Sequence, residues 1–269
     1  AANTTGNNNS AFGALSLDAN TVGDRNTALG YKSLTTFNPS SNADTYNTAV
    51  GALSLQNLTT GTTNTAVGGQ AMELATTGAN NTAMGYGALN ANTTGVQNVA
   101  VGVEALDTNS TGGSNTAIGY ASLYANTTAS NNTAVGHNSL KANTTGHSGV
   151  AVGKDALAAN TTGNYNVAVG VDALTTNTTG GENTAVGIQA MMQNTTGASN
   201  TAMGTSVLDA NTEGSNNTAI GASALGLNTT GTRNTALGGA ALTASTTAND
   251  NTALGYQAMT ATTTGTGCV

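Results

Sequence analysis

The sequence is poor in several residue types on which common classes of protein depend. It has one cysteine, one proline and no tryptophan, and aromatic residues make up only 3% of its 269 residues. A single cysteine, Cys268, excludes an intrachain disulfide framework. We interpret Cys268 as an incidental residue close to the end of the sequence, and an interchain cross-link at that position is the alternative.

Charged residues are equally scarce. They make up 6% of the chain, with five lysines and arginines in all and a net charge of −7, whereas about a quarter of the residues of a typical soluble domain are charged. Binding to nucleic acid depends on clustered lysine and arginine, so the composition disfavours a nucleic-acid partner. No apolar run approaches the length that crosses a bilayer, and we predict no membrane insertion.

What the sequence has instead is a repeat with a strict period. The motif Asn-Thr-Ala-apolar-Gly, with few substitutions, returns at every seventeenth residue from Asn47 to Asn251. A fixed period of this size predicts that each repeat is one structural unit stacked on its neighbours. The biased composition alone would also fit a disordered chain, but the regular placement of apolar residues favours a folded one.

Repeat positions are numbered here from 1, at the asparagine of the motif, to 17. The consensus is N-T-A-V-G-x-x-A-L-x-x-N-T-T-G-x-x, and only the step from Asn26 to Asn47 is longer than the others. Its extra residues lie within residues 35–46, which we expect to form an outer loop, because repeat proteins place insertions in loops on one face. The array occupies residues 1–269 as one continuous domain. Both ends cut through a repeat, so we expect a piece of a longer fibre.

Seventeen residues are too few for a pair of helices and suit one turn of a β-solenoid. A short strand is expected at positions 1–5, because position 2 is almost always Thr or Val and both are β-branched. We expect a second strand at positions 7–10 and a second corner at Asn-Thr-Thr-Gly, positions 12–15. The predicted fold is therefore all-β: a parallel β-solenoid, or β-roll, of about sixteen 17-residue coils.

Glycine occupies position 5 in every repeat. This predicts a corner at which the backbone is left-handed or too crowded for a Cβ atom. Position 1 is Asn except at Gly149, and we expect a positive φ there too, because Asn and Gly tolerate it best. The predicted coil-corner glycines are Gly13, Gly30, Gly51, Gly68, Gly85, Gly102, Gly119, Gly136, Gly153, Gly170, Gly187, Gly204, Gly221, Gly238 and Gly255.

Asparagine also recurs at position 12, within the sequence Asn-Thr-Thr. Equivalent residues of stacked coils lie above one another, so Asn and Thr side chains can form hydrogen-bonded ladders. Each Asn-Thr-Thr is also formally an acceptor for N-linked glycosylation. We favour the ladder, because a repeated geometry already explains a repeated asparagine. The Asn-Thr-Thr runs begin at Asn3, Asn92, Asn126, Asn143, Asn160, Asn177, Asn194 and Asn228.

Apolar residues occupy neighbouring positions of the first strand. Position 3 is always Ala, and position 4 is always a larger apolar residue. Since neighbouring residues of a strand point to opposite faces, one face fills the coil and the other presents an apolar stripe. We expect the Ala or Ser at position 8 and the Leu or Met at position 9 to divide in the same way. Charged residues occur at positions 7, 10 and 17, which marks these as solvated.

A stripe of this length would exceed the apolar patches that monomers normally expose. We therefore predict that position 4 forms an interface with other copies of the chain. The predicted interface residues are Phe12, Leu29, Val50, Val67, Met84, Val101, Ile118, Val135, Val152, Val169, Val186, Met203, Ile220, Leu237 and Leu254.

The run Asn-Thr-Ala-Val-Gly-x-x-Ala resembles the head repeat of YadA-like trimeric autotransporter adhesins, which reads roughly S-V-A-I-G-x-x-A. Arrays of this kind are also similar to the shafts of phage tail fibres and related bacterial surface fibres. The resemblance covers essentially the whole chain and implies a left-handed β-roll in a homotrimer, with the apolar strand facing the common axis. The residues that match V, A, I, G and A in one repeat are Thr65, Ala66, Val67, Gly68 and Ala71.

No constellation with a recognisable chemistry stands out from the repeat. His137 and His147 are read as outer-loop residues, and no phosphate loop, calcium-binding repeat or catalytic triad is visible. We predict no catalytic, cofactor-binding or metal-binding residues and no enzyme. Tyrosines at position 6 either pack at the rim of the apolar stripe or grip a sugar, and we favour rim packing. They are Tyr31, Tyr86, Tyr120 and Tyr256.

Together these features predict an extracellular structural and adhesive fibre segment, on a cell surface or a virion. It would self-associate and present a repetitive surface, or extend a tip, toward a surface receptor or glycan, with affinity gained by multivalency. One alternative is an extracellular filament whose subunits join end to end, because the strand edges of a solenoid are open to pairing. Another is an ice- or surface-binding solenoid that uses the threonines at positions 13 and 14.

Overall fold

A computed structural model describes residues 3–269, as two units, Ala1–Asn132 and Thr133–Val269, called unit 1 and unit 2. Both units are all-β, and the described residues include no helix, hence none that could span a bilayer. Each unit is a parallel β-solenoid with a 17-residue repeat, as the sequence predicts. The repeats make about 14 turns in all, fewer than the sixteen coils expected.

Each coil contributes one three-residue strand, formed by positions 2–4 of the repeat, and two further two-residue strands pair with each other at the insertion of unit 1. In unit 1 the strands are β1 (Ser10–Phe12), β2 (Gly23–Asp24), β3 (Thr27–Leu29), β4 (Ala43–Asp44), β5 (Thr48–Val50), β6 (Thr65–Val67), β7 (Thr82–Met84), β8 (Val99–Val101) and β9 (Thr116–Ile118). In unit 2 they are β10 (Thr133–Val135), β11 (Val150–Val152), β12 (Val167–Val169), β13 (Thr184–Val186), β14 (Thr201–Met203), β15 (Thr218–Ile220), β16 (Thr235–Leu237) and β17 (Thr252–Leu254).

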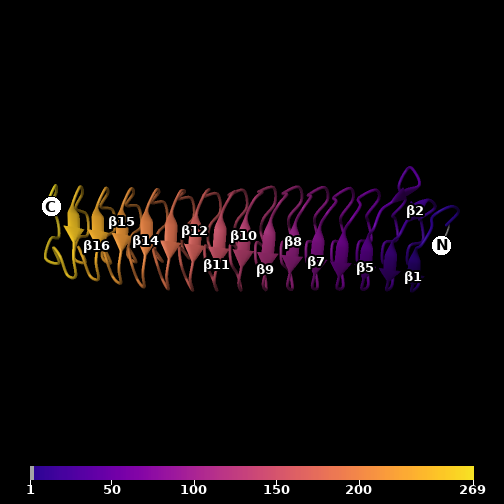
Figure 1. Ribbon diagram of the computed structural model, residues 1–269, viewed down its shortest axis with the longest axis horizontal. Coiled ribbons are helices and arrows are strands. Elements are labelled where there is room, and N and C mark those ends of the chain that lie inside the picture. Colours follow the sequence, from indigo (N-terminus) through magenta and orange to yellow (C-terminus); the bar gives the residue numbers. More distant parts are fainter. Residues whose placement is uncertain (1–2) are drawn as a thin grey trace. The chain divides into compact units, whose positions relative to one another are not determined.

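Strands of successive coils pair in parallel, position for position. Ala49 pairs with Ala66 in unit 1, and Ala151 pairs with Ala168 in unit 2. Figure 1 shows the strands of each unit side by side, with the rest of every coil returning to the start of the next strand. The register places identical residues in rows along each unit, which is the condition for side-chain ladders.

The second strand expected at positions 7–10 does not form. Instead the chain turns there, with left-handed backbone at positions 7 and 9, as at Glu104 (φ 57°) and Leu106 (φ 54°). A strand would send positions 8 and 9 to opposite faces, but the turn buries both, so Ala105 and Leu106 are completely buried. The prediction that this pair divides between the two faces is therefore wrong. All of its apolar surface fills the coil.

The glycine corner at position 5 is confirmed. All fifteen of these glycines have φ between 124° and 142°. A Cβ atom on Gly51 would lie 2.5 Å from the carbonyl oxygen of Gly68 in the next coil. The prediction of a positive φ at the position-1 asparagine is wrong. The residue with positive φ lies one position earlier, at position 17, as at Asn80 (φ 59°).

The asparagine at position 1 is buried and forms a ladder. The side-chain oxygen of Asn47 accepts hydrogen bonds from the backbone N–H and the side-chain amide of Asn64, at 3.0 and 3.3 Å. The same amide donates to the carbonyl oxygen of Gly78 at 2.8 Å. The side-chain oxygen of Asn64 in turn accepts from the backbone N–H of Asn81 in the following coil at 3.0 Å. Asn64 thus links its own coil to both neighbours and satisfies backbone groups that would otherwise be buried without partners.

The predicted asparagine ladder at position 12 is also confirmed. The amide of Asn109 donates to the side-chain oxygen of Asn92 at 3.0 Å and to the carbonyl oxygen of Gly112 at 2.9 Å. Leu58 and Ala75, both buried, take the place of asparagine at this position earlier in unit 1. Position 3, positions 8 and 9 and the two ladders together make up the interior.

The ladder at position 12 ends with a defect that predicts a stabilising substitution. Ser245 follows Asn228, and the side-chain oxygens of both are buried without a hydrogen-bond partner. In Ser245→Asn the new amide would donate to Asn228 and to the carbonyl of Ala248, as Asn126 does to Ala129 at 3.0 Å. We expect a gain of about 1 kcal/mol in unfolding free energy, measured by chemical denaturation. A Ser245→Ala control, which adds no amide, should show no such gain.

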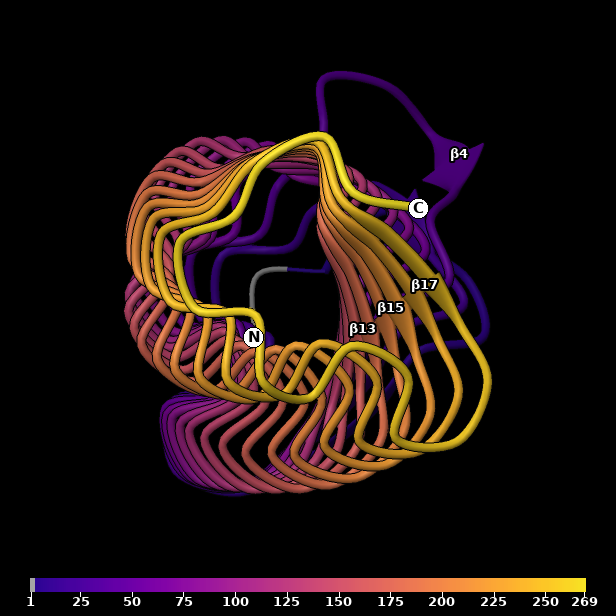
Figure 2. The ribbon, with the colours of Figure 1, turned by 90° about the vertical axis from the view of Figure 1, so that its left-hand side faces the viewer.

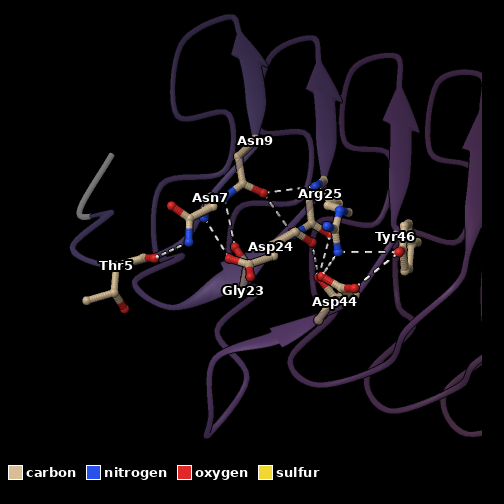
Figure 3. A network of polar contacts seen from close by, with 10 residues as sticks. Thr5, Asn7, Asn9, Gly23, Asp24, Arg25, Asp44 and Tyr46 are labelled. Atoms are coloured by element: carbon tan, nitrogen blue, oxygen red, sulfur yellow. Dashed lines mark hydrogen bonds and ion pairs between the residues drawn. The ribbon is translucent and has the colours of Figure 1, made fainter.

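The insertion within residues 35–46 carries β4 and lies outside the outline of the coils (Figure 2). Strand β4 pairs in parallel with β2 of the preceding coil. Figure 3 shows the polar contacts at this junction, where Arg25 forms an ion pair with Asp44 and lies over the ring of Tyr46. The Tyr46 hydroxyl donates to Asp44 at 3.1 Å. These contacts hold the loop against the preceding coil.

Candidate functional site: the exposed strand face

The strand alternates between the interior and the solvent. Ala66 at position 3 is completely buried, whereas Val67 at position 4 and Thr65 at position 2 lie half-exposed on the outer side. The same alternation holds in unit 2, where Ala202 is buried and Met203 is 43% exposed. The structure thus places the predicted position-4 residues on the outer face of each unit, and each chain by itself leaves them uncovered.

Every position-4 side chain is at least half-exposed, and the two most exposed, Phe12 and Leu254, lie in the first strand of unit 1 and the last strand of unit 2. Val50, Val67, Val101, Val135 and Val186 are half-exposed. The others are exposed: Phe12, Leu29, Met84, Ile118, Val152, Val169, Met203, Ile220, Leu237 and Leu254. Phe12 and Leu254 are covered by a neighbouring strand on one side only, since β1 and β17 are edge strands. Each row is continuous within its unit.

The structure adds apolar residues that the sequence analysis left out. Position 6 follows the corner glycine and carries exposed Val103, Val171 and Ile188 as well as the tyrosines. The ring of Tyr86 lies beside Gly69, at position 6 of the preceding coil, since a Cβ atom on Gly69 would meet it at 3.6 Å. This agrees with the rim packing favoured for these tyrosines. We call positions 2, 4 and 6 together the exposed strand face. Position 6 could have been predicted from the sequence by continuing the alternation of positions 2 and 4 past the glycine.

Charge is kept away from the centre of this face. Positions 2 and 4 carry no charged residue, and no charged side chain among residues 3–269 is buried. At position 10, burial raises the pKa of Asp107, and the neighbouring carboxylate of Glu104 raises it further. Burial likewise raises the pKa of Asp209. These half-buried acids lie beyond the turn, so an apolar partner on the strand face would not have to desolvate them.

One salt bridge sits on the edge of the face in unit 2. Lys154, at position 6, contacts the carboxylate of Asp155 at position 7. Burial by itself would raise the pKa of Asp155, but the hydrogen bonds from Lys154 and Asn138 outweigh it and lower the pKa. At position 17 the guanidinium of Arg233 binds Asp250 through two bonds of 2.6 and 2.9 Å and lowers the pKa of that carboxyl. The positive charges of Lys154 and Arg233 are therefore each paired with a neighbouring carboxylate.

The threonine rows behave differently at their two positions. At position 13 the hydroxyl donates a hydrogen bond to the backbone of the next coil. The hydroxyl of Thr76, for example, donates to the carbonyl oxygen of Thr93 at 2.9 Å. At position 14 the threonines, such as Thr77 and Thr94, are exposed. Only position 14 thus turns its hydroxyls to solvent, and it lies on a bend rather than on a flat strand. This arrangement weakens the case for a flat ice-binding grid.

The remaining candidate groups do not gather into a site. His147 packs edge-on against the ring of Tyr165, with ring centres 4.9 Å apart, and His137 is exposed. Among residues 3–269 no three His, Cys, Asp or Glu side chains approach one another closely enough to bind a metal. The thiol of Cys268 contacts the carbonyl oxygen of Thr266 at 3.8 Å.

Comparison with known proteins does not assign the chain to a family. No protein-family model matches it, and no curated protein matches its sequence. The resemblance to trimeric adhesin heads and tail-fibre shafts stays a prediction drawn from the repeat motif.

Proposed function

We propose that this protein is a structural and adhesive segment of an extracellular fibre, in which copies of the chain associate through the exposed strand face. The observation that supports this is the row of apolar side chains at position 4, which every coil turns outward. The assembly expected from the resemblance is a homotrimer with the strand faces around a common axis. The outward surface of the fibre would then be the threonine-rich and loop side of the coils.

Covering the apolar rows at position 4 would contribute a substantial part of the free energy of association. Fully covering an aliphatic side chain contributes about 1.5–3 kcal/mol, and these residues are roughly 40% exposed, as Met203 and Leu237 are, each at 43%. The eight position-4 residues of unit 2 would then contribute roughly 5–10 kcal/mol. Association costs about 4–15 kcal/mol in lost freedom. The free energy gained by covering position 4 alone is therefore only about as large as the cost of association, and burial of positions 2 and 6 is needed for a stable complex.

Another copy of the chain is the occupant that best fits this face. The face repeats with the period of the coil, and only a surface with the same period can match it along a whole unit. A second copy has that period by construction. The absence of charge at positions 2 and 4 also means that two such faces can meet without burying unpaired charges.

The oligomeric state tests the proposal directly. Multi-angle light scattering of the purified chain at micromolar concentration should give three times the monomer mass of 26.1 kDa. A monomer under these conditions would refute self-association through the strand face. Long continuous fibres in electron micrographs would instead support the end-to-end filament.

A charge placed on the face should disrupt the oligomer. In Val169→Glu the carboxylate would be buried between copies without a partner, at a cost of about 3–5 kcal/mol. We expect association at least about 100-fold weaker, from light scattering across a dilution series. The matched control is Thr179→Glu, at position 14, where Glu213 already occurs and is exposed. If both variants dissociate equally, or neither does, the strand face is not the interface.

A further inference from the structure

Triplets of the form Asn-x-Ser/Thr, which can accept N-linked sugar, occur in two structural settings in this chain. The first begins at asparagines of the ladder at position 12, although Asn20 and Asn211 start no such triplet. The second begins at position 17, with its hydroxyl residue at position 2 of the following strand. Its members are Asn8, Asn80, Asn131 and Asn216. One further triplet begins at the half-buried Asn57, at position 11. Sequence alone treats all of them as equivalent, but the fold does not.

The ladder asparagines have no room for a sugar. Asn194 is completely buried, and its amide nitrogen donates to Asn177 at 2.7 Å and to the carbonyl of Gly197 at 2.9 Å. Both amide hydrogens are therefore in use inside the coil. A glycosylated amide keeps only one hydrogen and carries a bulky hydrophilic group, which belongs on a surface. The folded ladder excludes it.

The asparagines at position 17 have the opposite environment. Asn80, Asn131 and Asn216 are exposed. Each lies at a left-handed corner, with φ of 59°, 64° and 60°, and is held there by its own backbone N–H, which donates to the preceding coil at 3.0, 3.1 and 3.0 Å. The backbone is thus fixed by bonds that do not involve the side chain. A group attached to the side-chain amide would project into solvent without disturbing the stack.

We propose that Asn80, Asn131 and Asn216 are acceptor sites for N-linked glycans compatible with the folded solenoid, and that the buried position-12 asparagines of the ladder, from Asn92 to Asn228, are not. In the modification, the amide nitrogen bonds to the anomeric carbon of an oligosaccharide. The bond from that carbon to the diphosphate of a lipid-linked donor breaks, and the amide proton passes to a base of the transferase. The proposal does not depend on self-association.

Secretion of the chain from a glycosylating eukaryotic host, followed by glycopeptide mapping of the folded product, tests this assignment. We expect sugar at Asn80, Asn131 and Asn216 and none at ladder positions such as Asn194. The proposal is overturned by sugar on a ladder asparagine in protein whose thermal midpoint is unchanged. It is also overturned if Asn80 and Asn216 are bare in the secreted product.

Two matched variants separate the acceptor triplet from the fold. Thr82→Val removes the hydroxyl of the Asn80 triplet but installs the residue that already occupies position 2 in the next coil, Val99. It should lose one glycan. The pair Gln97→Asn and Val99→Thr creates a new triplet at position 17, so the product should gain one glycan. The proposal is contradicted if the number of glycans stays the same in either variant.

Discussion

Replacing Gly68 by alanine should destabilise the solenoid by about 4 kcal/mol or more, through backbone strain and a steric clash. Gly68 has φ of 138°, where L-residues are strained, and an added Cβ atom would lie 2.7 Å from the carbonyl carbon of Gly85 and closer still to its oxygen. The obstacle is the backbone of the next coil, so no side chain can move aside. The coils must separate at this point.

The neighbouring glycine provides the control. Gly69→Ala adds the same methyl group one residue along, where the backbone is unstrained and the nearest atom is 3.6 Å away. We expect its unfolding free energy to stay within about 0.5 kcal/mol of the parent. Chemical denaturation measures both variants, and hydrogen exchange should locate the loss of protection in Gly68→Ala at the coils of β6 and β7. Equal stability of the two variants would contradict the proposed role of the glycine corner.

Replacing Asn81 by alanine should cost about 2–5 kcal/mol, because it leaves the buried backbone N–H of Asn98 without its partner and removes the amide's hydrogen bonds to Gly95 and Asn64. The Asn81 side chain accepts a hydrogen bond from the backbone N–H of Asn98 at 2.9 Å and donates to the carbonyl of Gly95 at 2.9 Å. Alanine supplies neither bond. The carbonyl of Gly95 keeps a hydrogen bond from the Asn92 amide at 2.9 Å, but Asn98 is completely buried, so water cannot replace the partner of its N–H. Stability in a solenoid is nearly a sum of neighbour terms, so the effect should centre on three consecutive coils.

The adjacent asparagine again serves as the control. Asn80 is exposed at a left-handed corner, so Asn80→Gly removes an amide while keeping a residue suited to that backbone. We expect a change of less than about 1 kcal/mol. Thermal and denaturant unfolding of the pair would show whether burial in the ladder, rather than asparagine itself, carries the stability. A loss in Asn80→Gly as large as in Asn81→Ala would count against the ladder.

The sequence predicted the stacking, the strand and the corner glycine correctly, because each depends on a local rule repeated without change. The short, fixed period excluded helix pairs, β-branched residues at position 2 favoured a strand, and unvarying glycine at position 5 required a backbone that other residues avoid. The outward direction of position 4 followed from alternation about the buried alanine.

Two of the wrong predictions share one physical cause. The strand expected at positions 7–10 gave extended backbone to the Ala-Leu pair, and the positive φ expected at the position-1 asparagines gave left-handed backbone to the residue type that tolerates it best. In the fold it goes to positions 7, 9 and 17 whatever residue stands there, including Leu89 at φ 54°. Closing so short a coil requires these turns, and burial of the leucine offsets the local strain.

The order of residues by itself therefore determined the architecture: a regular stack, its strand, its glycine corner and the apolar row beside it. Only the tertiary structure decided which asparagines are enclosed, that both apolar residues of the second pair fill the coil, and that position 6 extends the exposed strand face. The reason is that these properties depend on how a coil closes and on what the next coil covers, and neither is encoded in a single repeat.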